Sequence, residues 1–382
     1  MRIALLTDGI YPYVLGGMQK HSYYLAKYLA KSQVLVDLYH TGSSEANTTE
    51  LQGFSEEELA FITPYYVPFP SVSKLPGHYV LESYLYSEQV YKLLKDKEPV
   101  NFIYAQGFAG WKMIVEKKKG IPLPGIGVNF HGVEMFQPPP NFNVKLQHLL
   151  LKAPVKYILK NADYVFSLGG KLTIIQDKLT FKKILEIPIG IEKHWLEEST
   201  LIEKDKIRKF VFIGRYERRK GVEELQEVIN ELSKKYAFSF NFIGPIPADK
   251  QLKFEHVKYL GLIKDENEIK QILQSSDVLV CPSYSEGMPT VILEAMACGL
   301  AVLATDVGAV GLLVQEETGW LIPAGNKAAL SDAFVQAITC DEMVLDSKKI
   351  NARNLIKEKY TWEKVITFTL NQFAAVAPEP SL

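Results

Sequence analysis

Two glutamates stand eight residues apart in a stretch of otherwise small and apolar residues. The stretch reads C-P-S-Y-S-E-G-M-P-T-V-I-L-E-A-M-A-C-G, and its acids are Glu286 and Glu294. It predicts a buried helix that begins near Pro289 and ends at Gly299. A carboxylate on a buried helix is costly unless it is hydrogen-bonded. A structural partner would satisfy one acid, whereas two acids flanking an anion-binding helix N-terminus favour a polar ligand.

A second charged segment, G-R-Y-E-R-R-K-G, runs from Gly214 to Gly221. Within it, Arg215 follows a predicted strand and Lys220 precedes a predicted helix. Two cations placed in this way can hold a diphosphate without a metal ion. Taken alone, the segment fits a solvated charged loop better.

The amino-terminal half offers two weaker signals. Gly16 and Gly17 lie between a predicted strand and a predicted helix, where backbone amides can approach a phosphate. They lack the G-x-G-x-x-G spacing of a dinucleotide site, so a simple turn is an equal alternative. His131 follows a predicted strand and precedes Gly132, which makes it either a site residue or a structural histidine.

The elements that must position these residues alternate along the chain. Apolar runs predict strands at 2–7, 34–39, 62–69, 102–104, 126–130, 164–168, 210–213, 238–243, 257–260, 277–280, 301–307 and 319–323. Helical patterns cover 18–31, 79–97, 111–119, 144–159, 220–235, 266–274 and 361–374, with two more starting at 326 and 342. This alternation predicts α/β architecture with parallel sheets that bind ligands at the carboxyl ends of their strands. A polar stretch at 192–209 marks the boundary between two domains.

Composition narrows the class of protein. The 382 residues are 47% hydrophobic and 23% charged, with a net charge of -1, so nothing points to nucleic acid. Residues 1–190 hold 20 Lys and Arg against 16 Asp and Glu, whereas 191–382 hold 23 against 28. Three scattered cysteines indicate neither disulfides nor a zinc site. The sequence has neither a signal peptide nor a membrane span, so we expect a cytoplasmic protein.

A predicted helix at 144–159 alternates lysines with leucines and other apolar residues. Such a basic amphipathic helix can lie on anionic lipid. Packing against the core with a solvated lysine face is the alternative, which we favour. We therefore expect at most a peripheral membrane contact through the basic amino-terminal half, at the inner face of the membrane.

Together the motifs resemble the GT4-type retaining glycosyltransferases, which have the GT-B fold. The resemblance rests on G-G in the first loop, H-G after a mid-domain strand, G-R-x-x-x-x-K-G, and E-G-M-P-T-V-I-L-E. It covers nearly the whole chain and implies two Rossmann-like domains facing each other across a deep cleft. Residues 1–191 would form the acceptor-side domain and 192–360 the donor-binding domain. The C-terminal helix, 361–382, would cross back to the first domain.

The resemblance also implies residue roles. Glu294 would bind the ribose hydroxyls and Glu286 the hydroxyls of the donor sugar, while His131 would lie near the transferred sugar. Arg215 and Lys220 would neutralise the departing diphosphate in place of a metal ion. The remaining donor contacts would come from Gly16, Gly17, Leu262, Gly287, Met288, Pro289 and Thr290.

The implied function is metal-independent transfer of a hexosyl unit from a nucleotide-diphospho-sugar, with UDP favoured as the nucleotide. The acceptor would be a hydroxyl of a glycan, a lipid-linked molecule or a small molecule, in polysaccharide or glycoconjugate biosynthesis. Two alternatives stay open: a nucleotide-sugar epimerase on the same fold, and a non-catalytic protein that binds sugar nucleotides. The loops at 41–53 and 64–77, which should contact the acceptor, match no motif that identifies it.

Overall fold

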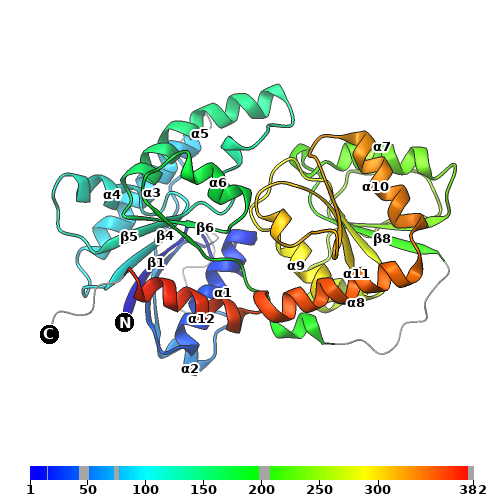
Figure 1. The fold of residues 1–382 in the computed structure, drawn as a ribbon. Helices are drawn as coiled ribbons and strands as arrows, with labels where there is room; N and C mark the ends of the chain where they lie inside the picture. The colour runs from blue at the N-terminus through cyan, green and yellow to red at the C-terminus, as the bar shows by residue number, and fades with distance from the viewer. Residues whose placement is uncertain (15, 43–50, 73–76, 198–206, 377–382) are drawn as a thin grey trace. The chain divides into compact units, whose positions relative to one another are not determined.

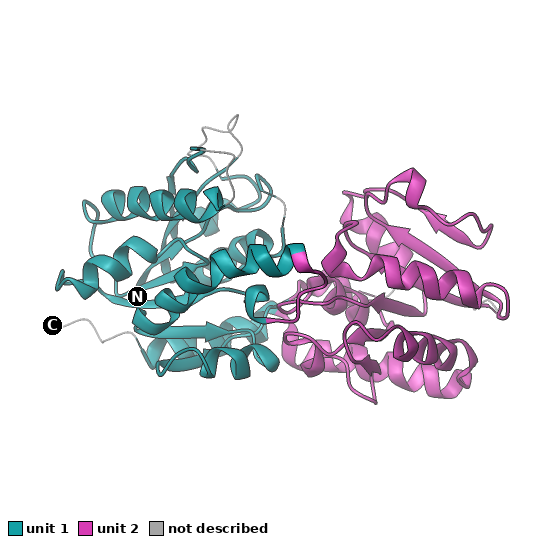
Figure 2. Ribbon diagram, turned by 90° about the horizontal axis from the view of Figure 1, so that it is seen from above, with its two compact units in different colours: residues 1–136, 143–190, 362–382 teal, residues 137–142, 191–361 magenta. Residues whose placement is uncertain are grey.

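The chain folds into two α/β units, each built on one parallel sheet (Figures 1 and 2). The computed structural model describes residues 1–14, 16–42, 51–72, 77–197 and 207–376. Unit 1 holds residues 1–136, 143–190 and the segment from Trp362; unit 2 holds 137–142 and 191–361. Parts of both predicted acceptor loops, half of the polar stretch at 192–209 and the end of the C-terminal segment lie outside the described residues.

Unit 1 contains a seven-stranded parallel sheet. Its strands lie in the order β3-β2-β1-β4-β5-β6-β7, so the order reverses between β1 and β4. Neighbouring strands on the two sides of that reversal leave a crevice at their carboxyl ends, where ligands of such sheets bind. The strands are β1 (Arg2–Leu6), β2 (Leu35–His40), β3 (Ile62–Tyr66), β4 (Phe102–Gln106), β5 (Gly125–Asn129), β6 (Tyr164–Ser167) and β7 (Lys183–Glu186).

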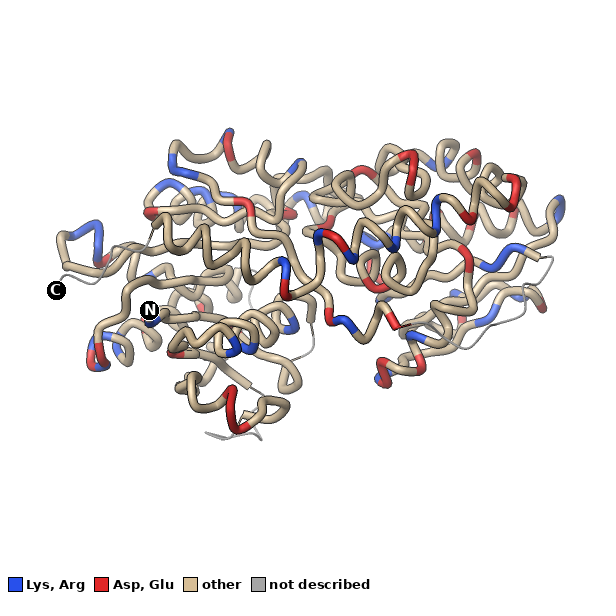
Figure 3. Tube along the Cα trace, turned by 60° about the horizontal axis from the view of Figure 1, so that its bottom comes forward, with Lys and Arg blue, Asp and Glu red and all other residues tan. Residues whose placement is uncertain are grey.

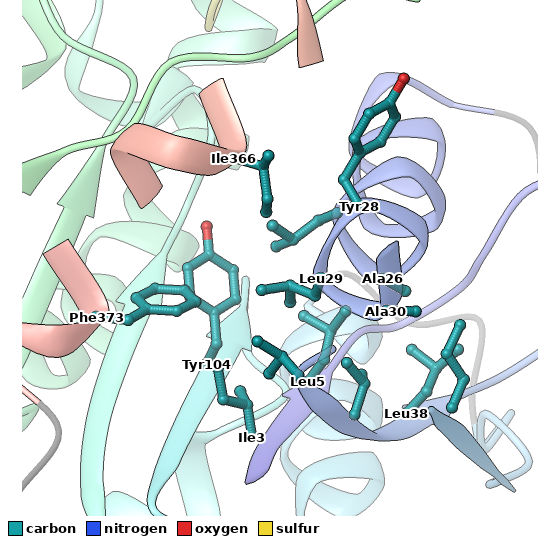
Figure 4. Close-up of a cluster of buried hydrophobic side chains, with 14 of the residues drawn as sticks. Ile3, Leu5, Ala26, Tyr28, Leu29, Ala30, Leu38, Tyr104, Ile366 and Phe373 are labelled. Carbon is teal, nitrogen blue, oxygen red and sulfur yellow. The ribbon is translucent and has the colours of Figure 1, made fainter. Parts of the chain in front are cut away.

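Helices cover both faces of this sheet (Figure 1). They are α1 (Gly17–Lys31), α2 (Glu56–Leu59), α3 (His78–Leu94), α4 (Trp111–Lys118), α5 (Phe142–Asn161), α6 (Lys171–Asp177) and α12 (Trp362–Ala374). The C-terminal helix α12 packs beside α1, and Figure 4 shows Ile366 and Phe373 pointing into the core between α12, α1 and the sheet. The predicted return of the C-terminal helix to the first domain is therefore present.

Unit 2 contains a six-stranded parallel sheet in the order β10-β9-β8-β11-β12-β13. Its strands are β8 (Arg208–Ile213), β9 (Phe238–Ile243), β10 (Val257–Tyr259), β11 (Val278–Cys281), β12 (Ala301–Thr305) and β13 (Gly319–Ile322). One face is covered by α7 (Val222–Leu232) and α10 (Lys327–Thr339), and the other by α8 (Glu266–Gln274), α9 (Thr290–Ala297) and α11 (Glu342–Leu355). Phenylalanines fill its core, with Phe210 and Phe334 stacked at 4.2 Å between ring centroids.

The structure differs from the sequence prediction in several places, and the short helices α2 and α6 are among the elements that were not predicted. The edge strand β7 was not predicted, because K-I-L-E carries only two apolar residues and gives no strand-length apolar run. The segment 137–142, which the sequence places in the first domain, groups with unit 2 instead. The Gln137 side chain donates a hydrogen bond to the Glu286 carbonyl there, at 2.8 Å.

Two phenylalanines on α12 test how firmly this helix is anchored. Phe373 is fully buried against Phe102, Tyr104 and Phe166, with ring centroids 5.6 to 5.8 Å away, whereas Phe368 is 43% exposed on the same helix. We expect Phe373→Ala to lower the free energy of unfolding by about 3–5 kcal/mol, since it leaves a core cavity. Phe368→Ala should change it by less than about 0.5 kcal/mol. Equal effects of the two substitutions in urea denaturation would contradict this anchoring.

Candidate active site

The helix α9 and the loop before it form as the sequence predicts. Pro289 occupies the N-cap position of α9, one residue earlier than expected, and Gly299 has a φ of 86°, in the left-handed region. The helix is buried on nearly every side, including at Ile292 and Met296. A buried helix of this kind presents the unpaired N–H groups of its first turn at one defined place, after Glu286.

The Glu286 carboxylate is buried, accepts hydrogen bonds from two side chains of unit 2 and forms an ion pair with a third. The Lys220 ammonium lies 2.5 Å from its Oε1, and the Ser283 hydroxyl donates to the same oxygen at 2.7 Å. The Arg219 Nη1 lies 3.8 Å from its Oε2. In the sequence analysis, Lys220 and Glu286 were related only by the donor-binding roles that the family resemblance implies. In the structure the two side chains are in direct contact.

These contacts keep Glu286 ionised. Burial raises the pKa of its carboxyl, but the charges of Lys220 and Arg219 oppose this effect, and the net result is a pKa below the usual value. Burying the carboxylate would otherwise favour its neutral form. The carboxylate is therefore an acceptor of hydrogen bonds held in one orientation.

The remaining charges of the G-R-Y-E-R-R-K-G segment fall into two groups. Arg215 is 70% exposed and pairs with Glu217, whose other oxygen accepts from Arg219. An exposed pair of this kind contributes about 1 kcal/mol or less, so a ligand can displace it. Around Glu286 and Glu217, the three cations Arg215, Arg219 and Lys220 exceed the two carboxylates by one positive charge, which favours an anionic ligand. Figure 3 shows acidic and basic residues interspersed along unit 2.

Arg218 pairs with Glu224 and stabilises the loop. Its guanidinium contacts Glu224, with one N–O distance of 2.8 Å, and stacks on the Tyr284 ring at 4.9 Å. The Tyr284 hydroxyl donates to Glu224 at 2.6 Å, and its backbone N–H donates to the carbonyl of Arg219 at 2.7 Å. These bonds tie the segment that carries Lys220 to the segment that carries Glu286.

Close backbone packing fixes the residues after Glu286. A Cβ placed on Gly308 would lie 2.2 Å from the carbonyl oxygen of Glu286 and 2.5 Å from that of Gly287. The N–H of Ala309 donates to the Gly287 carbonyl at 2.8 Å. Gly308 also has a φ of 55°, so a larger residue would be both strained and crowded.

Glu294 and Leu262, two other predicted donor-binding residues, have surroundings that differ from those of Glu286. Glu294 is buried in the second turn of α9, and its charge acts on Cys298 one turn later, where burial chiefly raises the thiol pKa to about 12. Met288 is also buried, and Thr290 begins the helix. Leu262 follows β10 and is 62% exposed.

The other predicted site residues lie in unit 1, at the carboxyl ends of its strands. His131 has a φ of 54°, and its N–H donates to Asn129 Oδ1 at 2.8 Å. Gly17 begins α1, and His21, one turn further along that helix, meets the His131 ring edge-to-face at 4.9 Å. The structure thus gathers His131 and the start of α1, which follows Gly16, in one region of unit 1.

Buried polar groups surround His131. Its Nε2 lies 3.1 Å from Gln106 Oε1, which also accepts from the Ser22 hydroxyl at 2.9 Å. Burial lowers the pKa of His131 to about 3, so the ring is neutral at pH 7. Burial and the neighbouring His131 also hold the pKa of His21 well below its usual value.

Sequence reasoning missed several of these residues. Arg219 stood beside Lys220 in the R-R-K run, so charge density could have indicated it. Ser283, Gln137 and Gly308 gave no signal, because their contacts depend on how separate loops meet. Among the described ranges, no three His, Cys, Asp or Glu side chains group as a metal site, and no helix is long and apolar enough to span a bilayer.

Comparison with known proteins identifies the family resemblance independently. Residues 207–340, all in unit 2, match the family described as glycosyl transferases group 1. The chain is 32% identical over 193 residues to a putative teichuronic acid biosynthesis glycosyltransferase of Bacillus subtilis, covering 47% of this chain and 48% of that protein. It is 30% identical over 208 residues to a phosphatidyl-myo-inositol mannosyltransferase of Mycobacterium leprae, covering 52% and 55%. The matches thus span about half the length of these relatives.

A solved structure agrees over the whole fold. The sucrose-phosphate synthase of Thermosynechococcus elongatus superposes with a TM-score of 0.80, covering 98% of this chain and 99% of that one at 21% identity. The predicted family resemblance and GT-B fold class are therefore confirmed.

Removing one partner of the buried Lys220–Glu286 pair should be costly. We expect Lys220→Met to lower the free energy of unfolding by about 3 kcal/mol, because it leaves the Glu286 carboxylate buried with less positive charge. Adding Glu286→Gln should recover part of this loss. The control Arg215→Met removes an exposed cation and should cost less than about 0.5 kcal/mol in urea denaturation. Similar costs for Lys220 and Arg215 would show that the buried pair is not stabilising.

The neutral His131 should make stability depend on pH. The unfolded side chain binds a proton near pH 6.5, but the folded one does so near pH 3, so acidification between these values favours unfolding. From pH 7 to pH 5 this costs up to about 2 kcal/mol. His131→Asn, which tolerates the left-handed backbone, should lose less stability over this range. An identical pH dependence of wild type and variant in urea denaturation would refute the assignment.

Proposed function

Because residues 207–340 belong to the group 1 glycosyltransferases, we propose that the chain transfers a hexosyl unit from a nucleotide-diphospho-sugar to an acceptor hydroxyl. The observation that best supports this proposed reaction is the 2.5 Å contact between Lys220 and Glu286. An ammonium suits a phosphate, whereas a carboxylate suits sugar hydroxyls. A substrate that satisfies both must present the two groups side by side, as the sugar and the phosphate of such a donor are.

Unit 2 supplies most of the proposed donor contacts. Lys220, Arg215 and Arg219 would meet the diphosphate, drawn by the excess positive charge and by the N–H groups at the start of α9. Glu286 would accept from the sugar hydroxyls, and Glu294 from the ribose. UDP is the expected nucleotide, because it is the more common donor nucleotide in the family that the sequence resembles.

The proposed reaction breaks the bond between sugar C1 and the phosphate oxygen. The bonding electron pair leaves with the diphosphate, the acceptor oxygen bonds to C1 from the same face, and its proton passes to the departing phosphate oxygen. Lys220 and Arg215 would stabilise the departing charge without a metal ion. Retention needs no protein nucleophile in this scheme, which suits Glu286, whose two oxygens already face Lys220, Ser283 and Arg219.

Unit 1 would complete the reaction from its own strand ends. The neutral His131 ring suits a hydrogen bond to the transferred sugar, because one ring nitrogen is already held by Gln106. The amides at Gly16 and Gly17 would approach the phosphates. One relative is named for transfer to phosphatidyl-myo-inositol, which supports a lipid-linked acceptor and a location at the inner face of the membrane.

A panel of nucleotides and their sugar conjugates tests the donor. We expect UDP or a UDP-sugar, rather than GDP or ADP compounds, to raise the melting temperature in a thermal-shift assay. A ligand at 100-fold its dissociation constant stabilises the folded state by about 2.7 kcal/mol. Incubation with the donor alone separates the alternatives, since an epimerase converts it without an acceptor. Absence of binding and of turnover with every donor would reject the proposal.

Substitution of Glu286 and of Glu294 should affect different steps, the first the transfer rate and the second nucleotide binding. Glu286→Gln should lower the transfer rate by about 10²–10³-fold while nucleotide affinity stays close to that of wild type. Glu294→Gln should instead weaken nucleotide binding, because it removes an acceptor for the ribose hydroxyls. Titration calorimetry with the nucleotide and assays of transfer measure the two effects. An equal loss of affinity and rate in both variants would contradict the division of roles.

A further inference from the structure

The helix α5 carries large apolar side chains that are exposed in the described part of the chain. Leu146, Leu149 and Leu150 are 57%, 54% and 49% exposed, and Phe142 at the first helical residue is 75% exposed. The helix lies at the edge of unit 1 in Figure 1. The leucine positions recur at a spacing of three and four, so the three side chains share one face. We call Leu146, Leu149 and Leu150 the α5 outer face.

This finding adds to the favoured interpretation of the predicted helix at 144–159, which was a core-facing helix with a solvated lysine face. The second half of α5 does pack on the core, through Val155, Ile158 and Leu159. At about 100° per residue these three point about 180° away from the leucines of the outer face. A helix that merely covers a core has one apolar stripe. α5 has a second one that faces solvent.

Charge shows what could cover the outer face. The helix holds four lysines, at 145, 152, 156 and 160, and neither Asp nor Glu. Within the described part of the chain, none of these lysines forms an ion pair. A second copy of the chain would set lysines against lysines across a symmetric interface, which is unfavourable. An anionic surface that also accepts leucine side chains meets both the charge and the apolar character.

We propose that the α5 outer face docks on the surface of an anionic lipid bilayer, with the leucines in the acyl boundary and the lysines at the headgroups. Helices that lie in the interface combine these two features. Gly77, just before α3, lies beside Leu150, and in the first turn of α3 Tyr79 and Leu81 are 42% and 51% exposed. The proposal deepens the proposed function by naming the membrane as partner, but docking itself requires no catalysis.

Sedimentation of the full chain with lipid vesicles tests this proposal. We expect it to bind vesicles that contain phosphatidylglycerol, to bind pure phosphatidylcholine weakly, and to be released by salt. Each lysine near the surface should contribute about fivefold to the partition coefficient. Glu286→Gln should bind as wild type does, so a failure of the proposed transfer reaction would leave this result intact.

Matched variants locate the docking surface. Leu146→Gln with Leu149→Gln should reduce vesicle binding at least tenfold, whereas Ile174→Gln with Phe181→Gln, at exposed positions elsewhere in unit 1, should not. In the same way, neutralising lysines 145, 156 and 160 should weaken binding, and neutralising 178, 182 and 183 should not. All these positions are exposed, and circular dichroism checks folding.

Three results would overturn the proposal. The first is a wild-type chain that binds no anionic vesicle at low salt. The second is equal loss of binding in the α5 variants and their controls. The third is a wild-type dimer in light scattering that the two leucine substitutions convert to a monomer while vesicle binding is absent, which would make the outer face an interface between copies.

Discussion

A carboxylate removed from water must be met by donors and positive charge, and much of the structure of unit 2 around α9 serves that requirement at Glu286. Lys220, Arg219 and Ser283 reach it from two separate loops, and Gln137 holds its carbonyl. Those loops are tied together in turn by Arg218, Glu224 and Tyr284. The buried pair therefore sets how close the two loops lie, and with them the start of α9.

The two units hold their polar groups in contrasting states. In unit 2 the buried acid is charged, because neighbouring cations outweigh the effect of burial on its pKa. In unit 1 the His131 and His21 rings are neutral, because removal from water disfavours their charged forms and lowers the pKa of each. The same loss of water thus leaves a charged acceptor in unit 2 and neutral rings in unit 1, and the difference comes from the cations that surround Glu286.

Local patterns allowed much of this to be predicted from the sequence. Pro289 and Gly299 marked the ends of α9, and the alternation of apolar runs with helical patterns was sufficient for two parallel sheets. The features that the sequence did not predict depend on contacts between residues that are far apart in the chain. Ser283 and Gln137 became site residues through loop packing, which spacing does not encode. Likewise, periodicity identified α5 as amphipathic but could not tell which of its two apolar stripes meets the core.

The return of α12 to unit 1 affects the order in which the chain can fold during synthesis. Trp362 and Phe373 complete a core whose other members, such as Tyr28, Phe102 and Phe166, emerge from the ribosome much earlier. All of unit 2 is translated between them. The whole sequence of unit 2 is therefore synthesised before that of unit 1 is complete. Until α12 is made, part of the apolar surface of unit 1 stays uncovered. This reverses the usual order, in which the amino-terminal domain folds first, and leaves unit 1 open to chaperones until α12 has been synthesised.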